Sequence, residues 1–273
     1  MTDRIYCSTG CLIGRENGFN YRLIAEYAPL VDVKAFELMM LKAYYEHFTD
    51  MACLFDKHGL VFPILHADKQ IGDLLSYGTP EDVAEGLRLF KLCCGLASDI
   101  GAKRVVLHLW GGQASDNCFT ERNLVSFKQI LEIADMYRLC VLVENIPCVK
   151  HNPLTHWDEL EECYGDKLQF IFDTRFGGFH EQLDEFAGSD RIERGIVTHM
   201  HISDYTGPAM NFKALRPILH PGEGIIDFVR FFSAIRGRYT GSITLESPVL
   251  GAGGSEDITK LNNTLSYIRK QMQ

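Results

Sequence analysis

Cys140-Val141-Leu142-Val143-Glu144-Asn145 is the stretch of this 273-residue chain that says most about its fold. Consecutive apolar residues, most of them β-branched, indicate a strand buried on both faces, as in a parallel sheet covered by helices. The run ends in a carboxylate, which is costly to bury without a partner. The segment therefore predicts a core strand whose terminal carboxylate, Glu144, has a role in binding or catalysis.

Similar runs recur along the chain, and a segment with helical spacing follows each of them. The predicted strands cover residues 5–8, 31–38, 60–66, 104–109, 140–145, 168–173, 196–203 and 242–246. The predicted helices cover residues 20–28, 40–58, 80–100, 120–138, 154–164, 180–194, 224–236 and 256–271, and Thr79 is placed to cap the third.

Eight strand-helix alternations predict an α/β fold, a (β/α)₈ TIM barrel in a single domain over residues 1–273. The length suits one barrel of the usual size, about 250 residues. An open doubly wound sheet also alternates strands and helices. It fits less well, because no glycine-rich phosphate loop follows the first strand.

Composition and charge narrow the class of protein. Hydrophobic residues make up 46% and charged residues 23% of the chain, which is ordinary for a globular protein. The net charge of −9 makes nucleic acid an unfavourable partner. Nine cysteines without a CxxC pair are typical of reduced thiols. No apolar run is long enough for a membrane span or a signal core, so we expect a cytoplasmic protein.

The last residues of the predicted strands share one chemistry. Barrel enzymes place their functional groups at the C-terminal ends of the strands. Metal-ligand residue types stand there in this chain, namely Glu37, His66, His108, Glu144, Asp173, His201 and Glu246. The carboxylates and the imidazole on strands five to eight predict a site for one divalent cation, Mn²⁺, Mg²⁺, Co²⁺ or Zn²⁺. A structural, hydrogen-bonded role is the alternative for each residue taken alone.

Five motifs in barrel order resemble the xylose-isomerase-like TIM barrel superfamily. They are Val143-Glu144-Asn145, Phe172-Asp173-Thr174, His199-Met200-His201-Ile202-Ser203-Asp204, His220-Pro221-Gly222-Glu223-Gly224 and Leu245-Glu246-Ser247. The superfamily includes sugar and sugar-phosphate isomerases and epimerases, inosose-processing enzymes and endonuclease IV-type enzymes. The resemblance implies that Glu144, Asp173, His201 and Glu246 ligate the metal and that the two glutamates act as general acid and base. It implies no organic cofactor.

The resemblance leaves two enzyme classes open. An isomerase or epimerase of a small polyhydroxylated carbonyl compound, in carbohydrate metabolism, is the leading hypothesis. An endonuclease IV-like zinc phosphodiesterase is the alternative, since His66 and His108 resemble ligands of a second metal in that branch and otherwise would contact substrate. That branch has a histidine where this chain has Phe176, and an Asp-x-His pair where this chain has Ile218-Leu219-His220. A barrel that binds sugar or a protein without catalysis is a third hypothesis.

Three further residues are candidates for substrate contacts. Trp110 follows the fourth predicted strand and could stack on a sugar face, with core packing as the alternative. Arg175 could bind a phosphate or carboxylate through its planar fork, with a surface ion pair as the alternative. His220 precedes a glycine-bearing turn on the same rim, whereas His199 is expected to lie deeper in the barrel. The oligomeric state is left open, and a homo-oligomer is compatible with the sequence.

Overall fold

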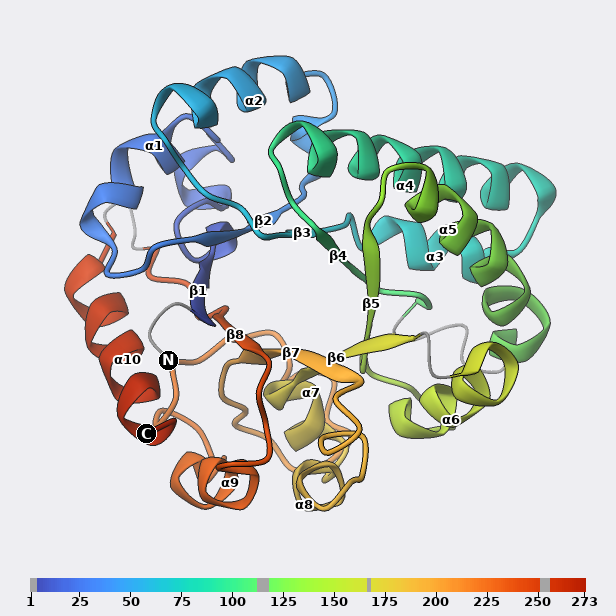
Figure 1. The fold of residues 1–273 in the computed structure, drawn as a ribbon. Coiled ribbons are helices and arrows are strands. Elements are labelled where there is room, and N and C mark those ends of the chain that lie inside the picture. Colours follow the sequence, from blue (N-terminus) through green and yellow to red (C-terminus); the bar gives the residue numbers. More distant parts are fainter. Residues whose placement is uncertain (1–3, 112–117, 166–167, 251–255) are drawn as a thin grey trace.

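The computed structural model describes residues 4–111, 118–165, 168–250 and 256–273. Eight parallel strands form a closed barrel in chain order, and β1 pairs with both β2 and β8 to close it. Figure 1 looks along this barrel and shows the helices as a ring around it. The predicted TIM barrel is therefore confirmed.

The strands lie close to their predicted positions. They are β1 (Ile5–Ser8), β2 (Phe36–Met39), β3 (Ile64–His66), β4 (Arg104–Leu107), β5 (Cys140–Glu144), β6 (Gln169–Asp173), β7 (Val197–Ile202) and β8 (Ser242–Leu245). The predictions for β2 and β3 began too early, because apolar residues before these strands pack in the core outside the ladder. The Phe62 ring, for example, packs at a tilt against Phe55 of α2.

The helices cover the outside of the barrel. They are α1 (Leu23–Tyr27), α2 (Phe48–Lys57), α3 (Gln70–Tyr77), α4 (Pro80–Asp99), α5 (Leu124–Met136), α6 (Pro153–Tyr164), α7 (Thr174–Phe179), α8 (Leu183–Ala187), α9 (Phe228–Ile235) and α10 (Ile258–Gln271). Thr79 caps α4 as predicted, because its hydroxyl oxygen accepts a hydrogen bond from the Asp82 N–H at 3.1 Å.

Two helices at the C-terminal rim, α3 and α7, were not predicted. Asp68 begins α3 by accepting a hydrogen bond from the Gln70 N–H, and Gly72 lets that helix approach β4, since a Cβ there would lie 2.4 Å from the His108 carbonyl oxygen. Helix α7 is only six residues long and contains two glycines, so its sequence carries no helical pattern. Both helices frame the mouth of the barrel.

The hydrophobic core has two parts. The larger part lies between the barrel and the helices. A smaller cluster fills the barrel interior and consists of Tyr6, Ala35, Ile64, Val106, Leu142 and Ile171. This interior layer forms an apolar floor beneath the C-terminal rim.

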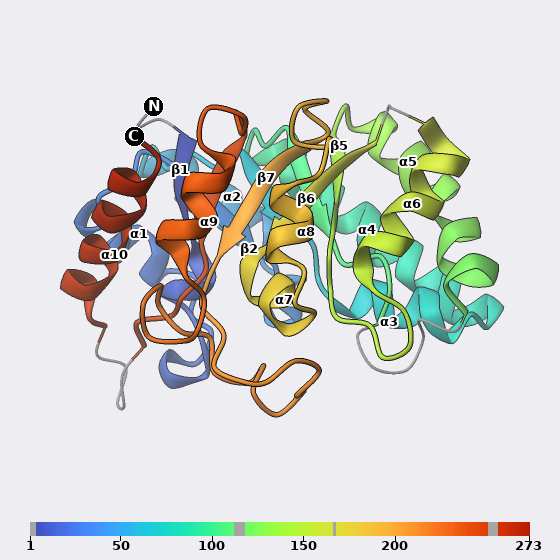
Figure 2. The same cartoon turned by 90° about the horizontal axis from the view of Figure 1, so that it is seen from below.

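The segment between β7 and α9 covers part of that rim. Figure 2 shows it at the end of the barrel toward which β7 points, whereas the end of α10 lies at the opposite end. Asp204 holds this segment, because its carboxylate accepts hydrogen bonds from the backbone N–H groups of Gly222, Gly224 and Ile226 at 2.9 to 3.0 Å. The glycine-bearing motif after His220 is thus a shaped loop anchored to the end of β7.

No disulfide bond joins the cysteines of the described residues. All nine cysteines are free thiols, and Cys7 and Cys11 are buried, with Cys11 Sγ directed at the Leu245 carbonyl oxygen. Among the helices of the described residues, none combines the length and apolar character that crossing a membrane requires.

Candidate functional site

The polar site lies directly above the apolar floor because strand side chains alternate in direction. A residue two positions after an inward-facing one also faces inward, one step nearer the C-terminal rim. Each floor residue on four strands is followed in this way by a metal-ligand type. The pairs are Ile64 and His66, Val106 and His108, Leu142 and Glu144, and Ile171 and Asp173.

Glu144, Asp173, His201 and Glu246 form one group, as the sequence predicts. Each offers a ligand atom, and these atoms all lie within 4.8 Å of one another. His201 Nδ1 lies 3.0 Å from Glu144 Oε1 and 3.4 Å from Glu246 Oε2. Asp173 Oδ2 and Glu246 Oε1 are buried and have no hydrogen-bond partner among the described residues, whereas Glu144 Oε2 lies 2.7 Å from His108 Nε2. Buried carboxylate oxygens left over beside an imidazole are the donor set that a divalent cation takes.

Asp173 is held so that one of its oxygens stays available. Its Oδ1 accepts a hydrogen bond from the Phe176 N–H at 2.9 Å and so caps α7. The Asn145 carboxamide fixes its backbone, since Oδ1 accepts from the Asp173 N–H at 2.6 Å and Nδ2 donates to the Asp173 carbonyl oxygen at 3.2 Å. The motif residue Asn145 therefore positions Asp173 and leaves Oδ2 directed at the group.

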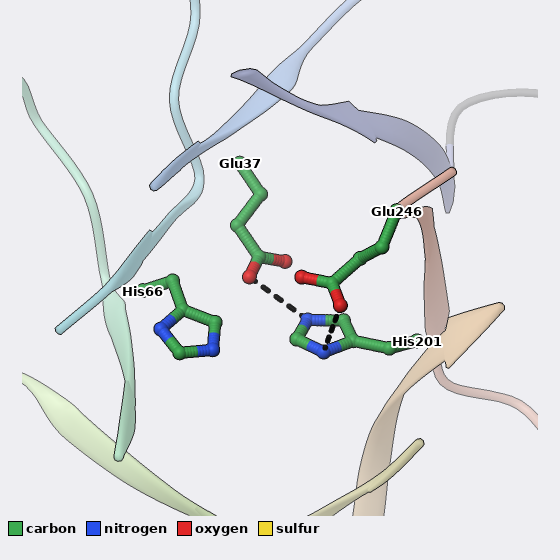
Figure 3. A group of neighbouring side chains, drawn as sticks. All are labelled: Glu37, His66, His201 and Glu246. Atoms are coloured by element: carbon green, nitrogen blue, oxygen red, sulfur yellow. Dashed lines mark hydrogen bonds and ion pairs between the residues drawn. The ribbon is translucent and has the colours of Figure 1, made fainter. Parts of the chain in front are cut away.

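Glu37 extends the group on its inner side, and it was named from the sequence only as a strand end. Figure 3 shows its carboxylate and that of Glu246 on either side of the His201 ring, with His66 facing them. His201 Nε2 donates to Glu37 Oε1 at 2.9 Å, so Nδ1 is the nitrogen left for a cation. A carboxylate behind a histidine ligand fixes its tautomer and raises its basicity. The alternation between Ala35 and Glu37 could have revealed this role.

His199 lies deeper than His201, as expected. Its Nε2 donates to Glu37 Oε2 at 2.9 Å, and its Nδ1 accepts from the Ser242 hydroxyl at 2.7 Å. Burial lowers the pKa of His199 to about 4, although Glu37 opposes this. A neutral His199 therefore supports Glu37 from below.

His66 and His108 both contact the far side of Glu144. His66 Nε2 lies 3.3 Å and His108 Nε2 lies 2.7 Å from Glu144 Oε2, and these three residues form a second group of ligand types. His66 Nδ1 donates to the Ala67 carbonyl oxygen at 2.9 Å, so Nε2 faces the group. Burial opposes protonation of His66, but Glu144 outweighs it and raises the pKa to about 9, whereas burial lowers the pKa of His108.

The two glutamates differ in acidity. Burial acts to raise the pKa of Glu144, but the charges of His108 and His201 outweigh it and hold that pKa well below its usual range. Burial raises the pKa of Glu246 to about 7, against the influence of His201 and with help from Glu144. Near neutral pH one carboxyl is thus a proton acceptor and the other can carry a proton, which is the division of an acid-base pair.

A cavity of about 470 Å³ opens onto this group. Its wall includes Glu144, Glu246, His66, His108 and Arg175, which places Arg175 on the cavity as predicted. Further lining residues were not predicted, because all except Met39 at the end of β2 lie in the segments after β2 and β3 or in α3. They are Met39, Met40, Leu41, Lys42, Asp68, Lys69, Gln70 and Asp73.

Trp110 and His220 lie elsewhere. The Trp110 ring is fully buried and packs edge-on against Phe119 and His156, so it has no face open to a substrate. The Nδ1 of His220 is bonded to Thr264 Oγ1 of α10 at 2.8 Å, and the residue does not line the cavity. The predicted substrate contacts of both residues are therefore not supported: core packing occupies Trp110, and attachment of the loop to α10 occupies His220.

A comparison with protein families agrees with this architecture. The family model described as xylose isomerase-like TIM barrel matches residues 27–270. A sequence comparison with curated proteins gave no match.

Solved structures of similar fold cover nearly the whole chain. The 3-keto-D-glucoside 4-epimerase of E. coli is 18% identical with a TM-score of 0.69, and the superposition covers 98% of this chain and 99% of that one. The D-allulose 3-epimerase of Methylomonas sp. in complex with D-allulose is 16% identical with a TM-score of 0.71, with coverage of 98% and 96%. The IolI protein with a bound zinc atom is 15% identical with a TM-score of 0.70, with coverage of 98% and 96%. At these identities the likeness establishes the fold.

Proposed function

This chain belongs to the xylose isomerase-like TIM barrel family, and on that premise we propose that it is a divalent-metal-dependent isomerase or epimerase. Its substrate would be a small polyhydroxylated carbonyl compound, such as a sugar, a sugar phosphate or an inosose. The observation that carries the proposal is the pair Glu144 and Glu246, two enclosed carboxyls on either side of His201 Nδ1 at the base of one cavity.

The candidate ligands are Glu144, Asp173, His201 through Nδ1, and Glu246. A divalent cation bound there would polarise a carbonyl or hydroxyl group of the substrate and acidify the adjacent C–H. Two enclosed carboxylate oxygens without a partner, Asp173 Oδ2 and Glu246 Oε1, support this ligand set, and Glu37 supports it from behind His201. Solved structures of similar fold include one with a bound zinc atom, which agrees with a metal-dependent function.

The chain's own residues would move the proton. Glu144, held in its carboxylate form by His108 and His201, would take the proton from the carbon next to the carbonyl group. Glu246 would return a proton from the other side, which inverts the carbon, or to the neighbouring atom, which shifts the carbonyl group. The cavity volume suits a molecule of monosaccharide size. Because the site is largely buried, it would also shield the enol form of the substrate from solvent protons.

The test is a screen of ketoses and inosose-like compounds with protein loaded with Mn²⁺, Mg²⁺, Co²⁺ or Zn²⁺. Turnover should vanish in Glu144→Gln and Glu246→Gln, both of which keep the size of the side chain, and should persist in Arg230→Gln on the exposed face of α9. Solvent deuterium should enter the product at the inverted carbon. Full activity of Glu246→Gln would contradict the assignment.

A zinc phosphodiesterase like the endonuclease IV-type enzymes is the second candidate. The group formed by His66, His108 and Glu144 favours it, since it offers ligands for another cation beside the first. Phe176 lines the cavity where a histidine would complete a further zinc site, which counts against it. Elemental analysis separates the two: about one metal per chain supports the isomerase, and two or three zincs with cleavage of an abasic oligonucleotide support the nuclease.

A further inference from the structure

Arg175 is a buried cation on the wall of the cavity. It follows Asp173 by two residues in α7, and its side chain is only 8% exposed. The guanidinium carbon lies 4.6 Å from the centre of the Phe176 ring, which holds the planar group by stacking. Its position is therefore set by packing on one face and leaves its edge to make polar contacts.

Those polar contacts are incomplete within the protein. A guanidinium has five N–H donors. Nη1 donates to the Leu215 carbonyl oxygen at 2.8 Å, and Nε is enclosed without any acceptor among the described residues. No carboxylate of those residues lies within ion-pair distance, in contrast to the half-buried Arg191, which pairs with Asp158 and Glu161. A buried charge that lacks a counter-ion destabilises the fold unless a ligand supplies one.

The same cavity holds the proposed acid-base pair. Arg175, Glu144 and Glu246 all line it, so an anion bound to Arg175 would belong to the molecule that reaches the two glutamates. Lys42 and Lys69 add positive charge to the wall from the segments after β2 and β3. Asp68 and Asp73 of the same wall offset part of this charge. Arg175 acts on the Asp173 carboxyl through its charge, but it has no carboxylate within ion-pair distance among the described residues and its Nε has no acceptor there.

We propose that Arg175 binds an anionic group of the substrate, a phosphate or a carboxylate carried away from the reacting carbon. This rests on the proposed function and narrows it from polyhydroxylated carbonyl compounds in general to those that carry a negative charge. A guanidinium matches either group through two parallel hydrogen bonds, and such charge-assisted bonds gain strength in a desolvated site. A neutral sugar would leave the guanidinium of Arg175 with the Asp173 carboxyl, beyond ion-pair distance, as a nearby negative charge.

Matched substrate pairs test the proposal. Metal-loaded protein would be assayed with a ketose, the same ketose phosphorylated on its terminal hydroxyl, and the corresponding keto-sugar acid. We expect kcat/KM for at least one anionic compound to exceed that of the neutral ketose about 10- to 100-fold, the range of one or two charge-assisted hydrogen bonds. A preference for the phosphate or for the acid identifies the anion. Equal kcat/KM for all three would overturn the proposal and leave the isomerase assignment intact.

Two variants separate binding from folding. Arg175→Gln keeps a hydrogen-bonding side chain without the charge, and should remove the preference for the anionic compound mainly by raising its KM. Arg175→Lys keeps the charge but not the fork and should restore part of the preference. Arg230 is an exposed arginine of α9, and Arg230→Gln should change neither the preference for the anionic compound nor the turnover of the neutral ketose. If kcat/KM fell equally for charged and neutral substrates in both Arg175→Gln and Arg175→Lys, Arg175 would act through packing alone. That result would contradict the proposal.

A binding measurement needs no turnover. Inorganic phosphate would be titrated calorimetrically into metal-loaded wild type and Arg175→Gln protein, since phosphate held by the cation alone would bind equally to both. We expect binding about tenfold or more weaker in the variant. Equal affinities would overturn the proposal. Phosphate binding that depends on Arg175, in a protein that converts no ketose of any class, would support the anion site and reject the isomerase function.

Discussion

Nε2 of His201 lies 2.9 Å from Oε1 of Glu37, and this contact turns the other ring nitrogen toward Glu144 and Glu246. Glu37 is itself fixed, because the Thr244 hydroxyl donates to its Oε2 at 2.7 Å. Strands β2, β7 and β8 are thus joined through one carboxylate beneath the candidate metal centre. Glu37 also forms a group of ligand types with His66, His201 and Glu246. Both of its oxygens are already engaged by His201, His199 and Thr244, so we assign it the role of orienting His201.

Removing the charge of Glu37 should therefore weaken metal binding. In Glu37→Gln the side-chain amide can still hydrogen-bond to His201, but it no longer raises the basicity of the imidazole. Changes of this kind behind a metal ligand lower metal affinity about 10- to 100-fold. Competition with a fluorescent chelator measures the Mn²⁺ or Zn²⁺ dissociation constant. Glu161→Gln removes a partly buried carboxylate that pairs with Arg191 and Arg194 far from the site, and should bind metal as wild type does. An unchanged affinity in Glu37→Gln would show that His201 is held by other contacts.

Asn145 should contribute to stability through the two hydrogen bonds that join β5 to the end of β6. It is fully buried, so Asn145→Ala leaves the N–H and the carbonyl oxygen of Asp173 without partners and without water. We expect the free energy of unfolding to fall by about 1–3 kcal/mol for each unpaired group. Urea denaturation of the metal-free protein measures this change.

Asn262 provides the matched control for Asn145. It also bridges a backbone N–H and a carbonyl oxygen, those of Asp32 and Leu30, but at a position open to solvent. Water can replace the lost contacts in Asn262→Ala, so we expect a loss smaller than about 1 kcal/mol. Equal losses in the two variants would mean that burial does not set the strength of the Asn145 bridge.

The strand ends of this protein could be predicted because burial and chemistry coincide there. In β5 an apolar run leads without interruption into Glu144, and the same transition occurs at Asp173 in β6. Reading the last few residues of each predicted strand therefore found all four members of the group around His201. The alternation of side chains on a strand makes this inference independent of the exact strand bounds.

The contacts beyond the strand ends could not be predicted in this way. Trp110 follows a strand as a substrate contact would, yet its ring lies in the core against His156 of α6, which comes from a distant part of the sequence. His220 was placed near the site by its motif, but Thr264 of α10 binds its ring. The cavity wall formed by Lys42 and Asp68 comes from irregular segments, whose course depends on tertiary packing rather than on periodicity.

Gly224 should be essential for the loop that Asp204 anchors. A Cβ at this position would lie 2.3 Å from the Tyr205 carbonyl oxygen and 2.5 Å from Asp204 Oδ1, so Gly224→Ala must displace backbone. We expect a lower thermal midpoint and weaker binding of substrate, since Ile218 of the same segment lines the cavity. Gly95→Ala is the control, because a Cβ there meets nothing within 4 Å in α4, and it should stabilise the protein by about 0.5–1 kcal/mol. A Gly224→Ala protein as stable as wild type would show that the loop backbone accommodates the added Cβ at little energetic cost.

Metal affinity should increase as the pH rises through about 7. In the metal-free protein the Glu246 carboxyl has a pKa of about 7 because of its burial, and the carboxylates of Glu246, Glu37 and Glu144 raise the pKa of His201 well above its usual range against the effect of burial. A cation that binds both residues must displace their protons, so protons compete with the metal at low pH and the competition weakens as pH rises. Each proton released corresponds to a change of about tenfold in affinity per pH unit. Chelator competition at pH 6, 7 and 8 measures the slope, and Glu246→Gln, which has no carboxyl proton to lose, should show a shallower one between pH 6 and 7. An affinity for Mn²⁺ that stays constant from pH 6 to 8 would mean that neither Glu246 nor His201 gives up a proton to the metal.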